Sequence, residues 1–370
     1  MLLTDVTATV KVARQQLYWL SKRQLTTALN GKYNLEIVVS HSTSPYFNLA
    51  FEDYLFKNFP VYTKDFIEQE LPKKILFMYC NTQCVVIGRN QNPWKETNVI
   101  ALRNHHIPLI RRKSGGGTVF HDTGNVNYCV MVPATRFNRD EHALALCEAL
   151  NPGLEIAFQN EVGKETKSLR VNERHDIVNQ DNKKVSGSAY KLQKGKSYHH
   201  GTMLLNSRLD VLRNLLHKEN TLESITGAGV ESVKSPVANI GVTSDDFIQA
   251  TALHFWHLYS SKSSNLPAVR YVDETSITDT EKSEIATRQA EFHSWEWTFS
   301  STPKFSHTFL GEDNGDLKFS VNSGKISDIE TTSQEIEASK NSIIGLHYRG
   351  DEIARYIKSN YWSQRIKNSI

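Results

Sequence analysis

The chain has 370 residues, of which 39% are hydrophobic and 10% aromatic, so it can build a sizeable core and favours two domains over one. Its 43 basic and 40 acidic residues nearly balance, with a net charge of +3 and no basic stripe. A nucleic acid is therefore not expected as the main partner. No apolar run reaches the length of about 18 residues that a membrane span needs. The four cysteines suggest no disulfide framework, and we expect all four to be core thiols.

Residues 1–35 differ in composition from the rest of the chain. They contain five basic residues against the single acid Asp5. Helical periodicity places most of these basic side chains in one arc, beside an arc of apolar side chains. A basic, acid-poor, amphipathic start is typical of a mitochondrial presequence, and the alternative is an ordinary surface helix. We therefore expect residues 1–35 to be a targeting segment and the protein to lie in the mitochondrial matrix.

From residue 36 onward the sequence predicts a mixed α/β arrangement. Strands are predicted over residues 35–39, 75–80, 84–88, 126–132, 177–179, 184–190, 317–321 and 325–329, and another is predicted to begin near residue 200. Helices are predicted over residues 48–59, 139–150 and 244–260 and at the C-terminal end. Residues 75–80 and 84–88 are expected to form a hairpin, and a polar turn at residues 179–182 predicts a second one. The polar residues 260–285 are typical of a linker or a helix-rich bridge.

The segment at residues 111–122, RRKSGGGTVFHD, carries the most functional information. Its three consecutive glycines leave backbone N–H groups unshielded, so that anionic oxygens can approach closely. The two arginines and Lys113, which only Ser114 separates from the glycines, supply fixed positive charge. No Gly-Lys-Ser/Thr closes a Walker A loop here, and the GxGxxG fingerprint is also absent. The segment therefore predicts an anion site between two apolar strands, and the alternative is a tight turn or bulge.

A second informative segment is KKVSGSAYK at residues 183–191, followed by HHGTMLLN at residues 199–206. The small residues from Ser186 to Ala189 allow the backbone to lie against a ligand. Lys184 stands at the edge of this stretch. Taken alone, it would more often be a solvated surface lysine.

Together these motifs resemble the lipoate–protein ligase A family. The matching motifs are NLAFE at residues 48–52, VVIGRNQNPWKE at 85–96, RRKSGGGTVFHDTGNVNY at 111–128, KKVSGSAYK at 183–191, HHGTMLLN at 199–206 and SVKSPV at 232–237. WEW at residues 295–297 and FSH at 305–307 resemble the start of that family's accessory domain. The related biotin ligases carry an Arg/Gly-alternating loop that RRKSGGG does not match. The octanoyltransferase relatives use a cysteine nucleophile, and no cysteine lies in the loops that resemble the family's active site.

The resemblance implies an α/β fold, with α+β mixed sheets, that comprises two structural domains. Residues 36–285 would form a lipoate/biotin ligase-type catalytic domain. Residues 286–370 would form a small α+β C-terminal accessory domain. The protein would be a monomer.

The resemblance also implies the reaction. The family activates lipoate with ATP to lipoyl-AMP and transfers the lipoyl group to a specific lysine of a lipoyl-carrier domain, with Mg²⁺ accompanying ATP. The carrier would be the lipoyl domain of a 2-oxoacid dehydrogenase E2 subunit or the glycine-cleavage H protein. The alternative is a lipoyl- or octanoyltransferase that takes its acyl group from acyl-CoA or an acylated carrier protein without ATP. A non-catalytic carrier-binding protein is disfavoured because Lys184 and the glycine loop are both intact.

Site residues carry over from the family motifs by position. Lys184 would be catalytic, first between the lipoate carboxylate and the α-phosphate and then beside the carbonyl oxygen as a point charge. The residues implied for ATP or lipoyl-AMP are Arg112, Ser114, Gly115, Gly116, Gly117, Thr118, Val119, Phe120, Asp176 and Lys184. Those implied for the lipoate pocket are His121, Ser188, Ala189, His200 and Gly201.

Two positions depart from the family pattern. Arg174-His175-Asp176 stands where relatives usually have Arg-Asn-Asp, so His175 replaces an amide while Asp176 carries over as a ligand-side or Mg²⁺-side carboxylate. Lys113 stands where relatives often have a small polar residue and is expected to point to solvent. No metal cluster built from protein side chains is expected, because no carboxylate or cysteine stands at ligand spacing from the histidines.

Overall fold

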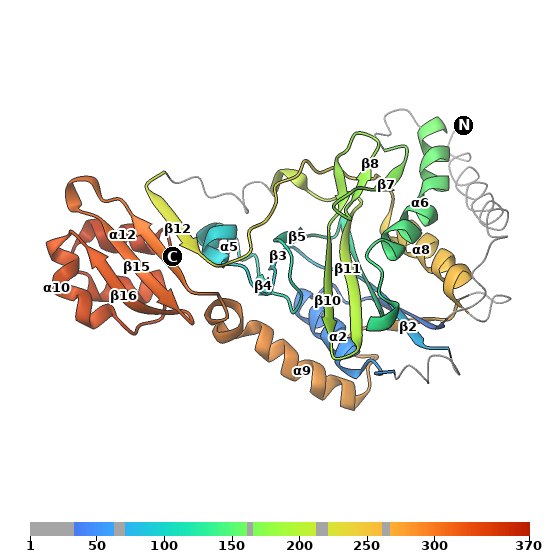
Figure 1. Cartoon of the computed structure of the whole chain (residues 1–370), viewed down its shortest axis with the longest axis horizontal. Coiled ribbons are helices and arrows are strands. Elements are labelled where there is room, and N and C mark those ends of the chain that lie inside the picture. Colours follow the sequence, from blue (N-terminus) through green and yellow to red (C-terminus); the bar gives the residue numbers. More distant parts are fainter. Residues whose placement is uncertain (1–32, 63–70, 161–165, 212–220, 261–266) are drawn as a thin grey trace, which may run out of the picture. The chain divides into compact units, whose positions relative to one another are not determined.

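The computed structural model describes residues 33–62, 71–160, 166–211, 221–260 and 267–370 (Figure 1). Except for residues 33–35, the predicted targeting segment lies outside the described residues, so its role stays a prediction. None of the helices within the described residues is long and apolar enough to cross a membrane.

Contacts within the chain define two compact units, each made from three stretches of sequence. The first unit takes its described residues from Met1–Thr82, His121–Ser207 and Ser235–Ile285, and the second from Gln83–Phe120, Arg208–Lys234 and Ala286–Ile370. Because these stretches alternate along the chain, the domain boundary expected after residue 285 stays a prediction.

A six-stranded mixed sheet forms the centre of the first unit, in the order β10-β11-β6-β2-β1-β13. Its strands are β1 (Asn34–Ser40), β2 (Lys73–Cys80), β6 (Asn125–Pro133), β10 (Ser188–Gln193), β11 (Lys196–Leu204) and β13 (Val269–Val272). Strand β1 pairs in parallel with β2 and β13, and the other neighbours are antiparallel. β2 and β6 are almost wholly buried, which explains the apolar runs at residues 75–80 and 128–132 within them.

A small antiparallel sheet completes the strands of the first unit. It contains β7 (Leu169–Val171), β8 (Ile177–Asn179) and β9 (Lys184–Ser186). The hairpin predicted around residues 179–182 is confirmed as β8–β9, with Asn182 in the left-handed region at φ 59°. The strand predicted over residues 184–190 is instead two strands, β9 and β10, which belong to different sheets and meet at Gly187.

The helices of the first unit cover the two faces of the six-stranded sheet. They are α2 (Pro45–Asn58), α6 (Glu141–Asn160), α8 (Ser244–Tyr259) and the short 3₁₀ helix η2 (Ala134–Arg136), and α9 (Asp279–His293) continues into the second unit. The caps explain where two helices begin: Ser44 Oγ accepts from Phe47 N at the start of α2, and Thr243 Oγ1 accepts from Asp246 N at the start of α8.

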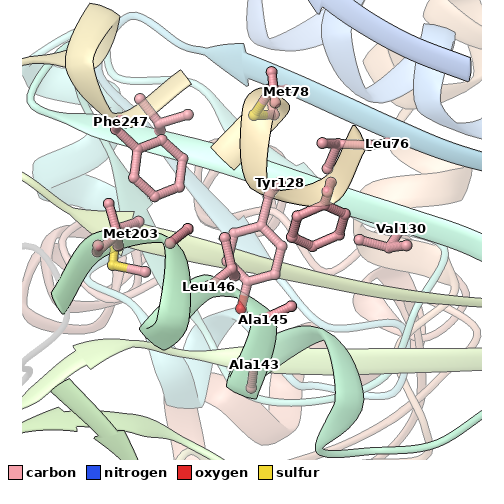
Figure 2. Close-up of a cluster of buried hydrophobic side chains, with 14 of the residues drawn as sticks. Leu76, Met78, Tyr128, Val130, Ala143, Ala145, Leu146, Met203 and Phe247 are labelled. Atoms are coloured by element: carbon pink, nitrogen blue, oxygen red, sulfur yellow. The ribbon is translucent and has the colours of Figure 1, made fainter. Parts of the chain in front are cut away.

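Alternation along β2 decides which side chains meet which helices. Leu76 and Met78 point to one face, where they join a core cluster with Leu146 of α6 and Phe247 of α8 (Figure 2). Phe77 points to the opposite face and contacts Phe51 of α2, with the ring centroids 5.3 Å apart. The sheet is thus buried on both faces.

The second unit contains two sheets. The antiparallel sheet β12-β14-β15-β16 contains β12 (Glu223–Gly227), β14 (Phe305–Phe309), β15 (Leu317–Asn322) and β16 (Lys325–Thr331). Its helical segments are η3 (Glu296–Ser300), η4 (Glu312–Asn314), α10 (Gln334–Ile343), α11 (Gly350–Ile353), η5 (Ala354–Tyr356) and α12 (Asn360–Lys367). Side chains from β14, β15, α10 and α12 share one apolar core, which includes the fully buried Trp362.

The smaller sheet of the second unit holds the glycine segment. It has the order β4-β3-β5, with β3 (Cys84–Ile87), β4 (Leu109–Arg111) and β5 (Val119–His121), and the short helices α4 (Pro93–Glu96) and α5 (Val99–Asn104) lie between β3 and β4 in sequence. The predicted hairpin of residues 75–80 and 84–88 is wrong, because β2 pairs with β1 and β6 whereas β3 pairs with β4 and β5. The expectation of a linker or helix-rich bridge at residues 260–285 is also only half right, because β13 joins the main sheet before α9 begins.

Candidate active site

The glycine loop, residues 114–118, connects β4 to β5 in the second unit. Gly116 has a φ of 86°, in the left-handed region that favours glycine, whereas Gly115 and Gly117 do not have positive φ. The turn after β3 packs directly against this loop, since a Cβ added at Gly88 would lie 2.0 Å from the Gly116 carbonyl oxygen. Two glycines from different motifs are therefore required here by the backbone geometry itself.

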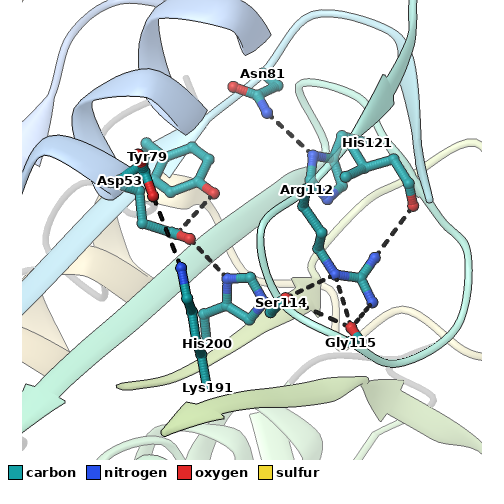
Figure 3. A network of polar contacts seen from close by, with 11 residues as sticks. Asp53, Tyr79, Asn81, Arg112, Ser114, Gly115, His121, Lys191 and His200 are labelled. Carbon is teal, nitrogen blue, oxygen red and sulfur yellow. Dashed lines mark hydrogen bonds and ion pairs between the residues drawn. The ribbon is translucent and has the colours of Figure 1, made fainter. Parts of the chain in front are cut away.

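Arg112 binds the carbonyl side of the glycine loop (Figure 3). Its buried guanidinium donates from Nη2 to the carbonyl oxygens of Gly115 at 2.6 Å and Gly117 at 2.7 Å, and from Nε to Ser114 Oγ at 2.9 Å. Among the described residues, no acceptor bonds the backbone N–H groups of the three glycines. A loop whose carbonyls are held by a cation and whose N–H groups remain available is suited to binding an anion. The direct phosphate contact expected of Arg112 stays a prediction.

The two basic neighbours of Arg112 are both held by the segment around Trp297. Arg111 is fully buried and donates to the carbonyl oxygens of Thr298 and Gln91, each at 2.7 Å. Burial lowers the pKa of Arg111 to about 9, with a smaller contribution from the charge of Arg89. Lys113 pairs with Glu291 at 2.6 Å and lies 3.5 Å from the centroid of the Trp297 ring. The expectation that Lys113 points to solvent is therefore wrong.

Lys184 begins β9 in the first unit. Its Nζ lies 2.8 Å from Asp176 Oδ1, and the Lys184 side chain keeps 24% of its surface exposed against 10% for Asp176. Its backbone is held on both sides, since Lys184 N donates to Pro236 O at 2.8 Å and Ala238 N donates to Lys184 O at 3.0 Å. The amine is therefore fixed in position, paired with a carboxylate and still open to solvent.

The tight turn that presents Asp176 contains His175 at a φ of 62°. Asn172 Oδ1 accepts from the backbone N–H groups of Arg174 and Asp176, both at 3.0 Å, which closes the turn. The His175 ring lies with Nδ1 2.6 Å from Asp140 Oδ1. Asparagine favours the left-handed region, and histidine tolerates it better than most residues do. The substitution for the family's usual amide thus keeps the turn and adds a contact to the residue just before α6.

Four of the five residues expected for the lipoate pocket meet as cross-strand pairs of β10 and β11. Ser188 lies opposite Gly201, and Ala189 lies opposite His200. Gly201 is needed for close packing, because an added Cβ would lie 2.4 Å from the hydroxyl oxygen of Tyr128. The fifth residue, His121, is buried at the end of β5, with Nδ1 3.0 Å from Asn81 Nδ2 (Figure 3).

His200 belongs to a buried polar trio that the sequence did not predict. Its Nδ1 lies 2.8 Å from Glu52 Oε1, and the Tyr79 hydroxyl donates to Glu52 Oε2 at 3.1 Å (Figure 3). Burial raises the pKa of Tyr79 well above its usual range, so its hydroxyl stays a donor. Glu52 lies in the NLAFE motif on α2, and the only signal for its role was an acidic residue among the apolar side chains of a helix.

The site residues expected from the sequence divide between the two units. Ser114 to Phe120 and Arg112 belong to the second unit, and Asp176, Lys184 and the pocket residues belong to the first. Within the part of the chain that the structure describes, no group of three or more histidine, cysteine, aspartate or glutamate side chains could hold a metal ion.

Comparison with known proteins identifies the family. A family model described as the lipoyl protein ligase A/B catalytic domain matches residues 44–256. The lipoate-protein ligase A of Bdellovibrio bacteriovorus is 30% identical over 345 residues, which cover 88% of this chain and 92% of the relative. The chain therefore belongs to the lipoate–protein ligase A family and is an enzyme, as its motifs predict.

Two solved structures show the same fold. The crystal structure of P. falciparum LipL1 in complex with lipoate is 24% identical and covers 90% of this chain and 98% of that chain, with a TM-score of 0.58. A bi-partite lipoate protein ligase from the archaeon Thermoplasma acidophilum, studied with its E2 lipoyl domain, is 21% identical and covers 72% and 96% of the two chains, with a TM-score of 0.51. The predicted lipoate ligase-type α/β fold is thus confirmed.

Proposed function

We propose that this enzyme activates lipoate with ATP and transfers the lipoyl group to a lysine of a carrier protein. In the first step a lipoate carboxylate oxygen attacks the α-phosphorus of ATP, the bond to the β-phosphate breaks, and pyrophosphate leaves. In the second step the carrier lysine, after losing a proton, attacks the carbonyl carbon of lipoyl-AMP, and AMP leaves with the bridging oxygen. Both steps gather negative charge on oxygen atoms, which fixed donors can stabilise.

The observation that carries this proposal is that the carbonyl groups and the N–H groups of the glycine loop are treated differently by the surrounding protein. Arg112 occupies the carbonyl oxygens of Gly115 and Gly117, while the N–H groups of the three glycines have no acceptor among the described residues. Backbone N–H groups arranged around a residue of positive φ form an anion-binding concavity, as phosphate loops do. We infer that the loop holds the phosphate oxygens of ATP and then of lipoyl-AMP.

Lys184 is the group proposed to act at the reacting atoms. Asp176 holds its amine at 2.8 Å, and the 24% exposure of the lysine side chain leaves it accessible to a bound anion. A compact ammonium can reduce the repulsion between the lipoate carboxylate and the α-phosphate during attack. The same ammonium can then stabilise the oxygen of the carbonyl when the carrier lysine attacks.

Mg²⁺ is proposed to enter with ATP. Magnesium usually keeps several waters and is bound through substrate phosphates and one or two carboxylates. Asp176 offers a single carboxylate, and the described residues contain no ready-made cluster. Most of the coordination would therefore come from the nucleotide.

The proposed carrier is the lipoyl domain of a 2-oxoacid dehydrogenase E2 subunit or the glycine-cleavage H protein. The E2 lipoyl domain studied with the archaeal ligase supports the first of these. To test which carrier is used, purified apo-E2 lipoyl domain and apo-H protein would be incubated with the enzyme under the same conditions. Intact-mass measurement would then show which of them is lipoylated. Modification of neither would contradict the proposed carrier.

The test of the proposed reaction compares two acyl donors. Purified protein is mixed with lipoate and MgATP, without carrier, and pyrophosphate is measured. A second mixture contains lipoyl-CoA or octanoyl-CoA and apo-carrier, without nucleotide. The proposal expects pyrophosphate in the first mixture. Acylated carrier in the second mixture, with no pyrophosphate formed in the first, would contradict it and favour the ATP-independent acyltransferase.

We also propose a mitochondrial location, on the basic and amphipathic character of residues 1–35. A fluorescent protein fused after residue 35 should co-localise with mitochondria. A variant fusion in which the basic residues of this segment are replaced by glutamine should not. Diffuse cytosolic fluorescence of the unaltered fusion would contradict the proposal.

A further inference from the structure

Gln91 is a buried amide that contacts three parts of the second unit. The residue is 0% exposed and follows β3 in the turn that packs on the glycine loop. Its Oε1 accepts from Gly88 N at 2.8 Å and from Thr118 Oγ1 at 2.9 Å, and its Nε2 donates to Ser232 Oγ at 3.0 Å. An amide side chain with both of its ends engaged in this way has a fixed orientation.

The hydrogen bonds of Gln91 close into a ring. Ser232 Oγ, which accepts from Gln91, also accepts from the backbone N–H of Thr118 at 2.9 Å. Thr118 is the first residue after the three glycines, so the ring holds the C-terminal end of the glycine loop by both its backbone and its hydroxyl group. Ser232 also contacts the loop at Gly117, where an added Cβ would lie 3.1 Å from Ser232 Oγ.

The backbone of Gln91 is held as firmly as its side chain. Its carbonyl oxygen accepts from Nη1 of the fully buried Arg111 at 2.7 Å. The same guanidinium donates to Thr298 O at 2.7 Å and to Thr302 Oγ1 at 2.8 Å. Gln91 therefore links the glycine loop to the well-packed segment at residues 298–302 rather than to a surface turn.

We propose that Gln91 is a positioning residue that preorganises the glycine loop for the nucleotide, acting through Thr118 and Ser232. A run of three glycines loses more conformational freedom on ordering than any other sequence of that length. If the ring did not hold the loop, this loss would oppose nucleotide binding, because ordering costs subtract directly from affinity. The inference rests on the proposed role of the loop in holding ATP. It gives a role to Gln91 and Ser232, to which the family motifs assigned none.

The prediction is specific to the nucleotide. Gln91→Met keeps the volume of the side chain but removes all three of its hydrogen bonds. We expect the Kd for MgATP to rise about tenfold, the effect of roughly one net hydrogen bond. The Kd for lipoate should stay within about twofold, since the residues proposed for its pocket belong to the first unit. In turnover, the KM for ATP should rise more than kcat falls.

A double-mutant cycle tests whether Gln91 acts through the ring. Calorimetry would give the Kd for MgATP of the full-length wild type, Gln91→Met, Ser232→Ala and the double variant. Gln334→Met is the matched control, because Gln334 is exposed at the start of α10. We expect each single ring variant to bind MgATP more weakly and the double variant to bind no more weakly than the worse single one, since members of one network are not additive. Additive losses, or an equal loss in the control, would overturn the proposal.

The outcomes separate this inference from the proposed function. If the wild type binds no MgATP, the proposed function fails and the inference fails with it. If the wild type binds MgATP and Gln91→Met binds it equally well, only the inference fails. Should Gln91→Met not fold, Thr118→Val and Ser232→Ala form the same cycle, because each removes one ring hydroxyl. Additivity in that cycle would also overturn the proposal.

Discussion

Replacing Lys184 by alanine removes the cation that we place at the reacting atoms. In the structure its amine lies 2.8 Å from Asp176 Oδ1, and the lysine side chain is 24% exposed. The loss of one positioned donor at a developing oxyanion typically costs roughly 10²–10³-fold in rate, or about 2.7–4 kcal/mol of transition-state stabilisation. We expect a loss of this size in both pyrophosphate formation and carrier lipoylation.

The stability cost of the same change should be much smaller. Asp176 loses its ion-pair partner, but water can reach the vacated position because Lys184 is partly exposed. A partly exposed pair contributes on the order of 1 kcal/mol, against a net stability of about 5–15 kcal/mol for a typical domain. Lys184→Ala should therefore stay folded, so its activity loss cannot be attributed to unfolding.

The assay combines single-turnover carrier lipoylation, followed by gel shift, with thermal unfolding of the same preparations. Lys183→Ala is the matched control, because it removes an exposed neighbouring lysine. Lys184→Arg should restore only part of the activity, since a planar guanidinium does not replace a compact ammonium. Transfer by Lys184→Ala at a near-normal rate would refute the assignment.

Three further variants test other features of the site and fold. Gly116→Val should abolish MgATP binding measured by calorimetry, because a β-branched residue is strained at the φ of 86° found there. The variant should unfold less readily than a variant of the apolar core would. Retained affinity for MgATP would refute the need for this backbone conformation. Gly187→Ala should slow pyrophosphate release several-fold, because its Cβ would lie 3.3 Å from Lys184 Nζ and displace it; an unchanged rate would show that the amine tolerates the shift. Burial lowers the pKa of Lys74 to about 8 in the folded state. Between about pH 8 and 10.5 the unfolded state therefore binds more protons than the folded state does. In that range, Lys74 makes the free energy of unfolding rise with pH. Lys74→Met should remove that rise in denaturant titrations, and parallel pH profiles for the two proteins would contradict the argument.

Element types were largely predictable from the sequence, whereas the pairing of strands was not. Apart from Lys73 and Lys74 at its start, β2 is as apolar as β3, so alternation reveals no exposed face and cannot assign a sheet. The short connection between them suggested a hairpin, but β2 pairs with β1 and β6, whereas β3 pairs with β4 and β5. Strand β13 was missed because it is a short, partly exposed edge strand in a polar stretch.

The candidate site shows the same division between local and distant information. The glycine loop and Lys184 stood out because glycine runs and small-residue stretches have a local chemical meaning. The contacts of Gln91 with Thr118 and Ser232 join residues 27 and 141 positions apart, and the Glu52–His200 contact joins residues 148 apart. Sequence spacing carries no information about such contacts, and Lys113 was misplaced because its partners Glu291 and Trp297 lie still farther along the chain.

The central claim is that the lipoyl group is activated as an adenylate, and isotope transfer tests it most directly. Lipoate labelled with ¹⁸O in its carboxylate would be incubated with MgATP, the protein and an excess of apo-carrier, and the released AMP would be analysed by mass spectrometry. If the carboxylate attacks the α-phosphorus, the bridging oxygen stays with AMP, and each AMP should carry one ¹⁸O. Lipoylated carrier accompanied by unlabelled AMP, or formed without AMP, would contradict the account.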